Sequence, residues 1–324
     1  MIKAIRIHET GGPEVMKLED VDLPDPAPGF AQVRHTAIGL NFIDTYHRSG
    51  LYPVPLPSGL GLEAAGIVEA IGEGVTDVKL GDRVAYGSGP LGAYAQAQNC
   101  FAAGLIKLPD TIKDDEAAAL MMKGLTVRYL FKETFKLKKG DTALFHAAAG
   151  GVGLIACQWA KALGVTLIGT VSSEEKAEMA RAHGCEHVIN YSTENTVERV
   201  MDITNGAKVP VVYDGVGKDT FEISLDCLAP RGLLASFGNA SGPVSGVDLS
   251  ILAGKGSLYV TRPTMLHYMM TPEERDAATS DLFDVVARGV VKVDINQRYA
   301  LADAAQSHID LQARKTTGAT IIEP

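Results

Sequence analysis

The stretch that decides the fold is His146-Ala147-Ala148-Ala149-Gly150-Gly151-Val152-Gly153, which lies between a strand-like segment, Thr142–His146, and an apolar helix-like segment, Leu154–Leu163. A turn from a strand into a helix directs free backbone N–H groups and the positive end of the helix toward a pyrophosphate. Glycine at 150 lets the backbone approach the ligand, and glycine at 153 lets the helix pack tightly against the strand. The stretch therefore predicts a dinucleotide-binding fold.

One position departs from the G-x-G-x-x-G pattern, because Ala148 stands where the first glycine is expected. The alternative interpretation of the stretch is a flexible glycine loop between two core elements. A phosphate-binding turn requires a strand before it and a helix after it, and the chain provides both. The phosphate-binding interpretation is therefore favoured.

Outward from this turn, the chain divides into two kinds of segment. From about Gly124, helix-like segments alternate with strands at Val165–Ser172, Val188–Asn190 and Val211–Tyr213, which is typical of βαβ units in a parallel sheet. The first hundred or so residues carry short strand-like segments separated by glycine and proline, which indicates a small barrel-like or sandwich-like unit. Residues 290–324 return to strand, helix and strand, and we expect them to rejoin this first unit.

The composition excludes several classes of protein. The chain has 324 residues, 46% of them hydrophobic, which is typical of a globular protein of two domains. Its net charge of −9 argues against nucleic acid as the main partner. The apolar runs are too short to cross a bilayer. Four scattered cysteines without a C-x-x-C pair, in a chain without an export signal, predict reduced thiols and a cytosolic location.

The end of the second strand of the alternating region indicates which dinucleotide binds. A fold that prefers NAD places an acid there, on the ribose 2′-OH, about 20 residues after the glycine turn. The chain has Val171-Ser172-Ser173 instead, and Lys176 can pair with a 2′-phosphate. Glu174 and Glu175 are expected to cap the next helix and to face solvent. The alternative for Lys176 is an ordinary surface lysine. We therefore predict NADPH as the cofactor.

Four stretches carry a resemblance to a known family: NFIDTY at 41–46, HAAAGGVGLIACQWAK at 146–161, SFGN at 236–239 and YVTRP at 259–263. Through them the chain resembles the medium-chain dehydrogenase/reductase superfamily, and within it the bacterial NADPH:quinone oxidoreductases related to zeta-crystallin. The resemblance implies an α/β protein with two domains. A GroES-like β-barrel catalytic domain would comprise residues 1–124 and 263–324, and a doubly wound Rossmann domain would comprise residues 125–262.

The zinc-dependent alcohol dehydrogenases of that superfamily differ at the metal site. Where they carry zinc ligands, this chain has Asn41, Leu62 and Met122. An amide, a leucine and a thioether cannot form a Zn²⁺ site, which needs thiolate, imidazole or carboxylate ligands. The four-cysteine structural zinc lobe is also missing. The comparison predicts a reductase without metal.

Without zinc, the hydride acceptor must itself be electrophilic, and a quinone or an α,β-unsaturated carbonyl meets this requirement. Hydrogen bonds could stabilise the charge that develops on its oxygen, and the candidate catalytic residues are Asn41, Tyr46 and Tyr52. The alternative for both tyrosines is packing with a satisfied hydroxyl group. The alternative for Asn41 is contact with the nicotinamide.

The resemblance also implies the residues that contact the cofactor. They comprise the loop beside the nicotinamide, the helix that leads into the Rossmann domain, the glycine turn, the ribose-phosphate pocket, and the ends of the fourth and fifth strands. Late in the chain, an arginine would add charge at the 2′-phosphate, although a solvated helix-end arginine is an equal alternative. These residues are Asn41, Phe42, Ile43, Asp44, Thr45, Tyr46, Thr126, Tyr129, Gly150, Gly151, Val152, Ser172, Ser173, Lys176, Tyr191, Gly215, Val216, Phe237, Gly238, Asn239 and Arg314.

These observations predict an NADPH-dependent quinone reductase. An alternative from the same class is a reductase of 2-alkenals or enones, and an alternative from another class is a structural or RNA-binding protein like some relatives of zeta-crystallin. The apolar segment Gly256–Thr261 is predicted to be an edge strand that pairs with a second copy, because an exposed apolar edge would otherwise favour aggregation. We therefore expect a homodimer.

Overall fold

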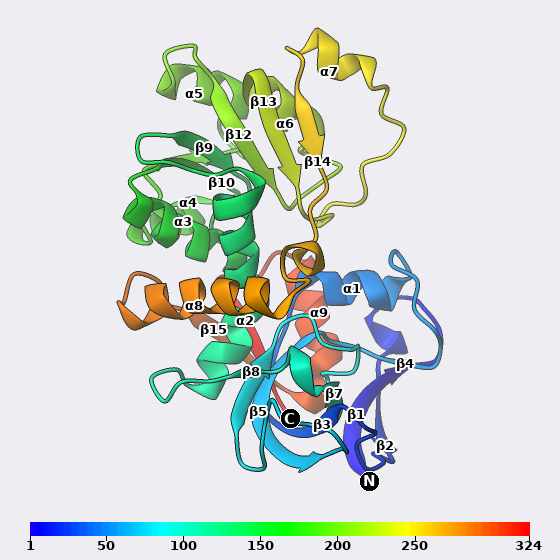
Figure 1. Cartoon of the computed structure of the whole chain (residues 1–324). Coiled ribbons are helices and arrows are strands. Elements are labelled where there is room, and N and C mark those ends of the chain that lie inside the picture. Colours follow the sequence, from blue (N-terminus) through cyan, green and yellow to red (C-terminus); the bar gives the residue numbers. More distant parts are fainter. The chain divides into compact units, whose positions relative to one another are not determined.

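The computed structural model describes residues 1–324, which form two compact units (Figure 1). Unit 1 comprises Met1–Lys123 and Val293–Pro324, and unit 2 comprises Gly124–Lys292. Each unit has its own cluster of buried apolar side chains. The interruption of unit 1 by unit 2 agrees with the predicted insertion.

Unit 2 contains a six-stranded sheet, in which all neighbouring strands are parallel. The strand order is β11-β10-β9-β12-β13-β14, so the direction of winding reverses between β9 and β12. Open parallel sheets bind ligands at such a reversal, beyond the carboxyl ends of the strands. The bounds are β9 Thr142–Phe145, β10 Thr166–Val171, β11 His187–Asn190, β12 Val209–Asp214, β13 Leu228–Ser236 and β14 Tyr259–Thr261.

The helices of unit 2 alternate with these strands, as the sequence predicted. Contacts join α3 to α4 and α5 to α6, as expected for a sheet that is wound in two directions. The bounds are α3 Gly151–Leu163, α4 Glu174–Ala182, α5 Thr196–Ile203, α6 Phe221–Cys227, α7 Ser250–Gly254 and α8 Pro272–Ala287. A further helix, α2 at Asp114–Tyr129, leads from unit 1 into unit 2 and ends in a π-helical turn at Leu130–Thr134.

Unit 1 holds a seven-stranded sheet and a three-stranded sheet. The large sheet has the order β15-β16-β3-β5-β6-β8, with β7 also paired to β3, and the small sheet has the order β2-β1-β4. The bounds are β1 Ile2–Ile7, β2 Lys17–Val21, β3 Phe30–Gly39, β4 Ser58–Gly59, β5 Glu63–Ile71, β6 Arg83–Tyr86, β7 Ala97–Phe101, β8 Ile106–Lys107, β15 Ile295–Ala300 and β16 Ala319–Glu323. Its two further helices are α1 Phe42–Ser49 and α9 Ala304–Gln312.

The strands of unit 1 do not close into a single barrel, which corrects the β-barrel expected from the sequence. The two sheets are separate, and an isolated bridge between Ala4 and Ala95 links the small sheet to the loop before β7. Backbone hydrogen bonds continue this link, from Ile5 N–H to the Tyr94 carbonyl and from Gln96 N–H to the Lys3 carbonyl. The small sheet is thus linked to the loop before β7 by a few backbone hydrogen bonds rather than by continuous strand pairing.

Two boundaries differ from those that the sequence indicated. Residues 263–292 group with unit 2, although the sequence placed them with the terminal segments. The reason is visible in α8, where Asp281 pairs with Arg128 at 3.0 Å and with Lys132 at 2.6 Å. The strand expected at Gly256–Thr261 begins only at Tyr259, because Gly256 and Ser257 form a turn with φ values of 118° and 55°.

Candidate functional site

The glycine turn joins β9 to α3, at the place where the sheet reverses its winding. Gly150 precedes the first turn of α3 in an extended conformation, and its N–H donates to the Ala147 carbonyl at 3.0 Å. A Cβ at Gly153 would lie 2.4 Å from the Ala147 oxygen and 2.5 Å from the Ala148 oxygen. A Cβ at Gly150 would meet only the Ala147 oxygen, at 3.3 Å. Packing within the protein therefore requires glycine at 153, whereas the space at 150 is needed only if a ligand approaches.

The end of β10 carries the residues for which the sequence predicted contact with a 2′-phosphate. Ser172 and Ser173 follow the strand, and the Ser173 hydroxyl accepts a hydrogen bond from the Lys176 N–H at 3.3 Å at the start of α4. Tyr191 lies alongside, since its N–H donates to the Val171 carbonyl at 3.0 Å. The Glu174 carboxylate instead accepts from Arg181 on its own helix, at 2.6 Å. The strand end is thus polar, and Arg181 engages the carboxylate of the first acid after it.

The loops after β12 and β13 are held together at the same edge of the sheet. The Phe237 N–H donates to the Asp214 carbonyl at 2.8 Å, and a Cβ at Gly238 would lie 2.3 Å from the Gly215 oxygen. The buried Asp214 carboxylate accepts from the N–H of Val216 at 2.8 Å and fixes the turn that contains Gly215. The sequence analysis missed this role of Asp214, although an acid at a strand end before a glycine was a usable signal.

Further cofactor residues predicted for unit 2 lie at the end of α2. Thr126 and Tyr129 are both buried, and the Tyr129 ring stacks on Tyr268 with centroids 4.7 Å apart. Burial raises the pKa of the Tyr129 hydroxyl above its usual value. Tyr129 therefore stays a neutral donor over the physiological range of pH.

In unit 1, α1 and the loop after it bring the proposed catalytic residues together. Asn41 is the residue before α1, and Tyr46 lies within it. The rings of Tyr46 and Tyr52 meet edge to face with centroids 5.2 Å apart, and Phe42 contacts Tyr46 on its other side at 5.8 Å. Tyr46 and Tyr52 therefore form one aromatic cluster with Phe42, and Asn41 lies directly before the same helix.

Asn41 also belongs to a buried network that the sequence analysis did not identify. Its Nδ2 donates to Oε2 of Glu63 at 2.6 Å, and Lys123 Nζ lies 3.1 Å from the same oxygen. The other oxygen, Oε1, accepts from the Met122 N–H at 2.7 Å. Glu63 is fully buried, and the Lys123 side chain is 7% exposed. The sequence did not indicate this cluster, because Glu63 is 22 residues from Asn41 and 60 residues from Lys123.

Asp44, on α1, forms a second buried network. Its Oδ2 accepts from the Asn41 N–H at 2.9 Å and from the Tyr94 hydroxyl at 2.8 Å, while Oδ1 is buried without a partner. Burial raises the pKa of Asp44 from 3.8 to about 7. The same hydroxyl lies 3.1 Å from Nε2 of His308, whose pKa burial and Arg48 lower from 6.5 to about 3. Near neutral pH, Asp44 can therefore hold a proton while His308 holds none.

The three positions that match zinc ligands lie in or beside the polar network of Asn41 and Glu63. No group of three or more His, Cys, Asp or Glu side chains in the structure is arranged to hold a metal ion. At the three positions, Asn41 binds Glu63, Met122 contributes only its N–H to that carboxylate, and Leu62 has no ligating group.

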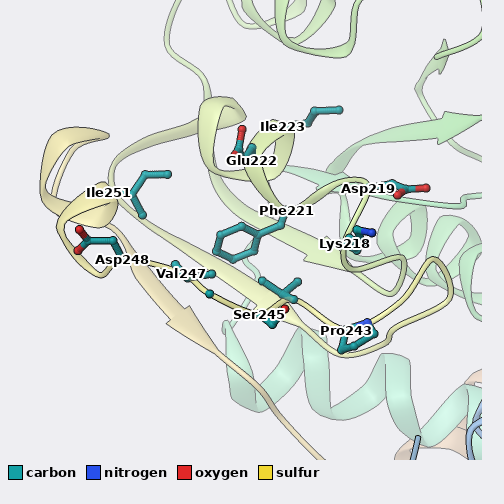
Figure 2. Close-up of a pocket in the computed structure, with 12 residues that line it drawn as sticks. Lys218, Asp219, Phe221, Glu222, Ile223, Pro243, Ser245, Val247, Asp248 and Ile251 are labelled. Atoms are coloured by element: carbon teal, nitrogen blue, oxygen red, sulfur yellow. The ribbon is translucent and has the colours of Figure 1, made fainter.

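Arg314 is exposed and belongs to unit 1, whereas Ser172, Lys176 and Tyr191 belong to unit 2. Unit 2 also holds a cavity of about 450 Å³, lined by Phe221, Ile251 and charged residues that include Lys218. Figure 2 shows these residues on or just before α6 and around α7. None of the residues predicted for catalysis or cofactor binding lines this cavity.

Comparison with known proteins agrees with this geometry. Residues 27–110 match the family described as "Alcohol dehydrogenase GroES-like domain", and residues 151–284 match "Zinc-binding dehydrogenase". The chain is 60% identical to a quinone oxidoreductase of Pseudomonas aeruginosa, over the full length of both, and 47% identical to a 2-haloacrylate reductase of Burkholderia sp., over 100% of this chain and 99% of that protein.

Among solved structures, the crystal structure of Escherichia coli quinone oxidoreductase complexed with NADPH is 54% identical. It matches 99% of this chain and 100% of that chain with a TM-score of 0.98. No helix in the structure of the present chain is both long and apolar enough to cross a membrane. The family matches and the end-to-end similarity show that the chain belongs to the quinone oxidoreductase family of the medium-chain dehydrogenase/reductase superfamily.

Proposed function

We propose that this protein is an NADPH-dependent quinone reductase that works without zinc. The observation that carries the proposal is the combination of Ser172, Ser173 and Lys176 after β10 in unit 2 with the buried polar cluster around Asn41 in unit 1. The similarity to the quinone oxidoreductase of Escherichia coli, whose structure contains NADPH, supports the cofactor and the class of reaction.

The residues of unit 2 fit the two phosphate groups of NADPH. The N–H groups at the start of α3 would hold the pyrophosphate, and the space at Gly150 lets it approach. Lys176 and Ser172 would bind the 2′-phosphate, because Ser172 directly follows β10 and Lys176 lies in the first turn of α4, where NAD-specific folds place an acid at the strand end. When bound, the cofactor would supply a hydride. The chain's task here is to hold the cofactor in one orientation.

The residues of unit 1 would stabilise the acceptor. Addition of a hydride to a quinone carbon places negative charge on a conjugated oxygen, and hydrogen-bond donors aimed at that oxygen lower the barrier. Tyr46 and Tyr52 are the candidate donors, because their rings are fixed against each other. Asn41 lies at the start of the same helix, and the Glu63 carboxylate already engages one of its two amide hydrogens.

A second candidate function is the reduction of an activated C=C bond. It is favoured by the 47% identity to a 2-haloacrylate reductase. The test is NADPH oxidation by the purified protein with benzoquinones, 2-alkenals and 2-haloacrylates. We expect kcat/KM to be highest for quinones. No turnover of any quinone, together with rapid turnover of a haloacrylate, would replace the first proposal with the second.

The zinc-free mechanism is tested separately. We expect full activity after incubation with a strong chelator, and less than one zinc per chain by elemental analysis. Loss of activity on chelation that added zinc restores would overturn this part of the proposal. The test is decisive because Asn41, Leu62 and Met122 offer no usual zinc ligand.

We further propose that the protein is a cytosolic homodimer. The edge strand β14 pairs only with β13, and it exposes Tyr259 by 62% and Val260 by 41%. A second copy could cover this apolar edge. Light scattering should give twice 34.3 kDa, and Val260→Lys should yield a monomer. A wild-type monomer at micromolar concentration would refute the dimer.

The cytosolic location rests on four buried free cysteines.

A further inference from the structure

We propose that Glu63 and Lys123 are positioning residues for Asn41, so that a buried ion pair holds the Asn41 amide in one orientation. The inference rests on the proposed function, because it assigns Asn41 to the reduction site. It goes beyond that function in naming two residues that act without touching the substrate.

The Glu63 carboxylate joins three segments of unit 1. The two oxygens of Glu63 have different partners: Oε1 accepts from the Met122 N–H at 2.7 Å, and Oε2 accepts from Asn41 at 2.6 Å and from Lys123 at 3.1 Å. The carboxylate therefore joins the start of β5, the interior of α2 and the residue before α1. None of these three segments can shift alone without breaking a buried bond.

The backbone around Glu63 leaves space for its carboxylate. Gly39 pairs with Glu63 across β3 and β5, and a Cβ at Gly39 would lie 2.3 Å from Oε2 and 2.2 Å from the Ala118 oxygen. Only glycine leaves room for the carboxylate at this point. The cluster is thus built into the sheet and helix, unlike a pair of surface side chains that meet by chance.

The free energy of burying the Glu63–Lys123 ion pair does not account for its presence. Burying a charged pair costs desolvation energy that its attraction barely offsets, and apolar side chains of the same volume are often as stable or more so. Stability alone therefore does not explain a pair of which Glu63 is fully buried and Lys123 is 7% exposed. Orientation does explain it, because an amide next to a carboxylate must present its NH2 group to that carboxylate.

The arrangement also refines the role of Asn41. Its backbone N–H is held by Asp44 at 2.9 Å, and one of its two amide hydrogens is held by Glu63. Donation to a carboxylate polarises the amide, which makes Oδ1 a stronger acceptor and the second hydrogen a weaker donor. Asn41 is therefore oriented mainly to accept a hydrogen bond, and stabilisation of the acceptor oxygen is left to Tyr46 and Tyr52.

The experiment uses the double variant Glu63→Gln/Lys123→Met, which leaves no unpaired charge buried. A glutamine has one oxygen, and if that oxygen serves the Met122 N–H, its NH2 group faces the NH2 group of Asn41. The Asn41 amide must then turn over. We expect kcat with a benzoquinone to fall roughly ten- to a hundredfold, the loss expected from misplacing one group at a reacting centre.

A double-mutant cycle with Asn41→Ala separates positioning from a general structural effect. If the pair acts through Asn41, adding Glu63→Gln/Lys123→Met to Asn41→Ala lowers kcat no further. Losses that multiply, or a double variant with full kcat, would overturn the inference. The dissociation constant of NADPH, from fluorescence titration, should change less than about threefold when Glu63→Gln/Lys123→Met is added to wild type or to Asn41→Ala, which is below 1 kcal/mol. A larger change would place the pair in cofactor binding and would also overturn it.

Two further variants keep the test decisive. If the double variant does not fold, Glu63→Asp keeps the charge near Lys123 and withdraws the carboxylate from Asn41, and its effect on kcat must likewise vanish in the Asn41→Ala background. Tyr86→Phe is the matched control in unit 1, because it deletes a buried hydroxyl 2.8 Å from His35 and 3.0 Å from Gln98, and kcat should stay within about twofold. If wild type reduces no quinone, the proposed function fails, and the same cycle is measured with a haloacrylate.

Discussion

Replacement of Asp44 by asparagine should change the way in which the stability of the protein depends on pH. Asparagine keeps an oxygen that can accept from the Asn41 N–H and the Tyr94 hydroxyl, as Oδ2 does now at 2.9 and 2.8 Å. It removes a carboxyl group whose pKa burial raises from 3.8 to about 7. The other charged groups that act on this carboxyl, Lys123 and Glu63, stay in place.

The sign follows from which state binds the proton. Between about pH 4 and pH 7 the folded protein keeps the Asp44 proton and the unfolded chain has lost it, so this group makes unfolding easier as the pH rises. A change of one in pKa corresponds to about 1.4 kcal/mol, so the whole effect is at most about 4 kcal/mol. Between pH 5 and pH 8 the free energy of unfolding of Asp44→Asn should therefore rise relative to wild type by about 2–3 kcal/mol.

Urea unfolding of both proteins at pH 5 and pH 8 measures this difference. The only tryptophan, Trp159, lies in unit 2, so the unfolding of unit 1 must be followed by near-ultraviolet circular dichroism of its tyrosines. Any constant loss caused by the buried asparagine NH2 group cancels between the two values of pH. A stability difference that is the same at both would refute a carboxyl that titrates near neutrality. Tyr94→Phe removes a hydrogen bond that lowers the Asp44 pKa, so it should extend the pH-dependent loss to higher pH.

Three other predictions concern the two parts of the site. Gly153→Ala should lower the free energy of unfolding by more than about 1 kcal/mol, because its Cβ would meet two carbonyl oxygens. Gly150→Ala should leave the free energy of unfolding nearly unchanged and weaken NADPH binding. Equal effects of the two variants in urea unfolding would contradict this. Lys176→Ala should weaken NADPH about tenfold or more in a fluorescence titration and leave NADH unchanged, and equal losses for both would reject the phosphate contact. Tyr46→Phe and Tyr52→Phe should each lower kcat roughly ten- to a hundredfold at unchanged NADPH affinity. If both variants keep the wild-type kcat with several quinones, the tyrosines only shape the pocket.

What the sequence predicted well was local. The turn from β9 into α3 depends on residues 146–153, and its strand, glycines and helix are contiguous in the chain. Ser173 caps α4, and the exposed Glu174 pairs with Arg181 on the same helix. Both interactions involve residues close in the chain, so the sequence could predict them. Short-range signals of this kind fix φ and hydrogen bonds within one or two turns.

What the sequence did not predict depends on partners far apart in the chain. Glu63 is 22 residues from Asn41 and 60 from Lys123, and only the register of β3 against β5 brings the carboxylate to Gly39. The placement of α8 with unit 2 depends on Asp281 and Arg128, which are 153 residues apart. Whether the strands of unit 1 close into a barrel likewise depends on how they pair. The hydrophobic pattern of each single strand does not specify this pairing.

The interruption of unit 1 by unit 2 has a consequence for synthesis on the ribosome. The edge of β3 at Ile38 and Gly39 pairs with β16 at Ile322 and Ile321, which are made about 280 residues later. At roughly 5–20 residues per second, that partner strand arrives only after about 15–60 seconds. Unit 2 is one continuous segment and can fold during this interval. The nascent sheet meanwhile has an unpaired strand edge, the feature most prone to intermolecular pairing, so chaperones that shield such edges would raise the yield of this protein more than those that act after release.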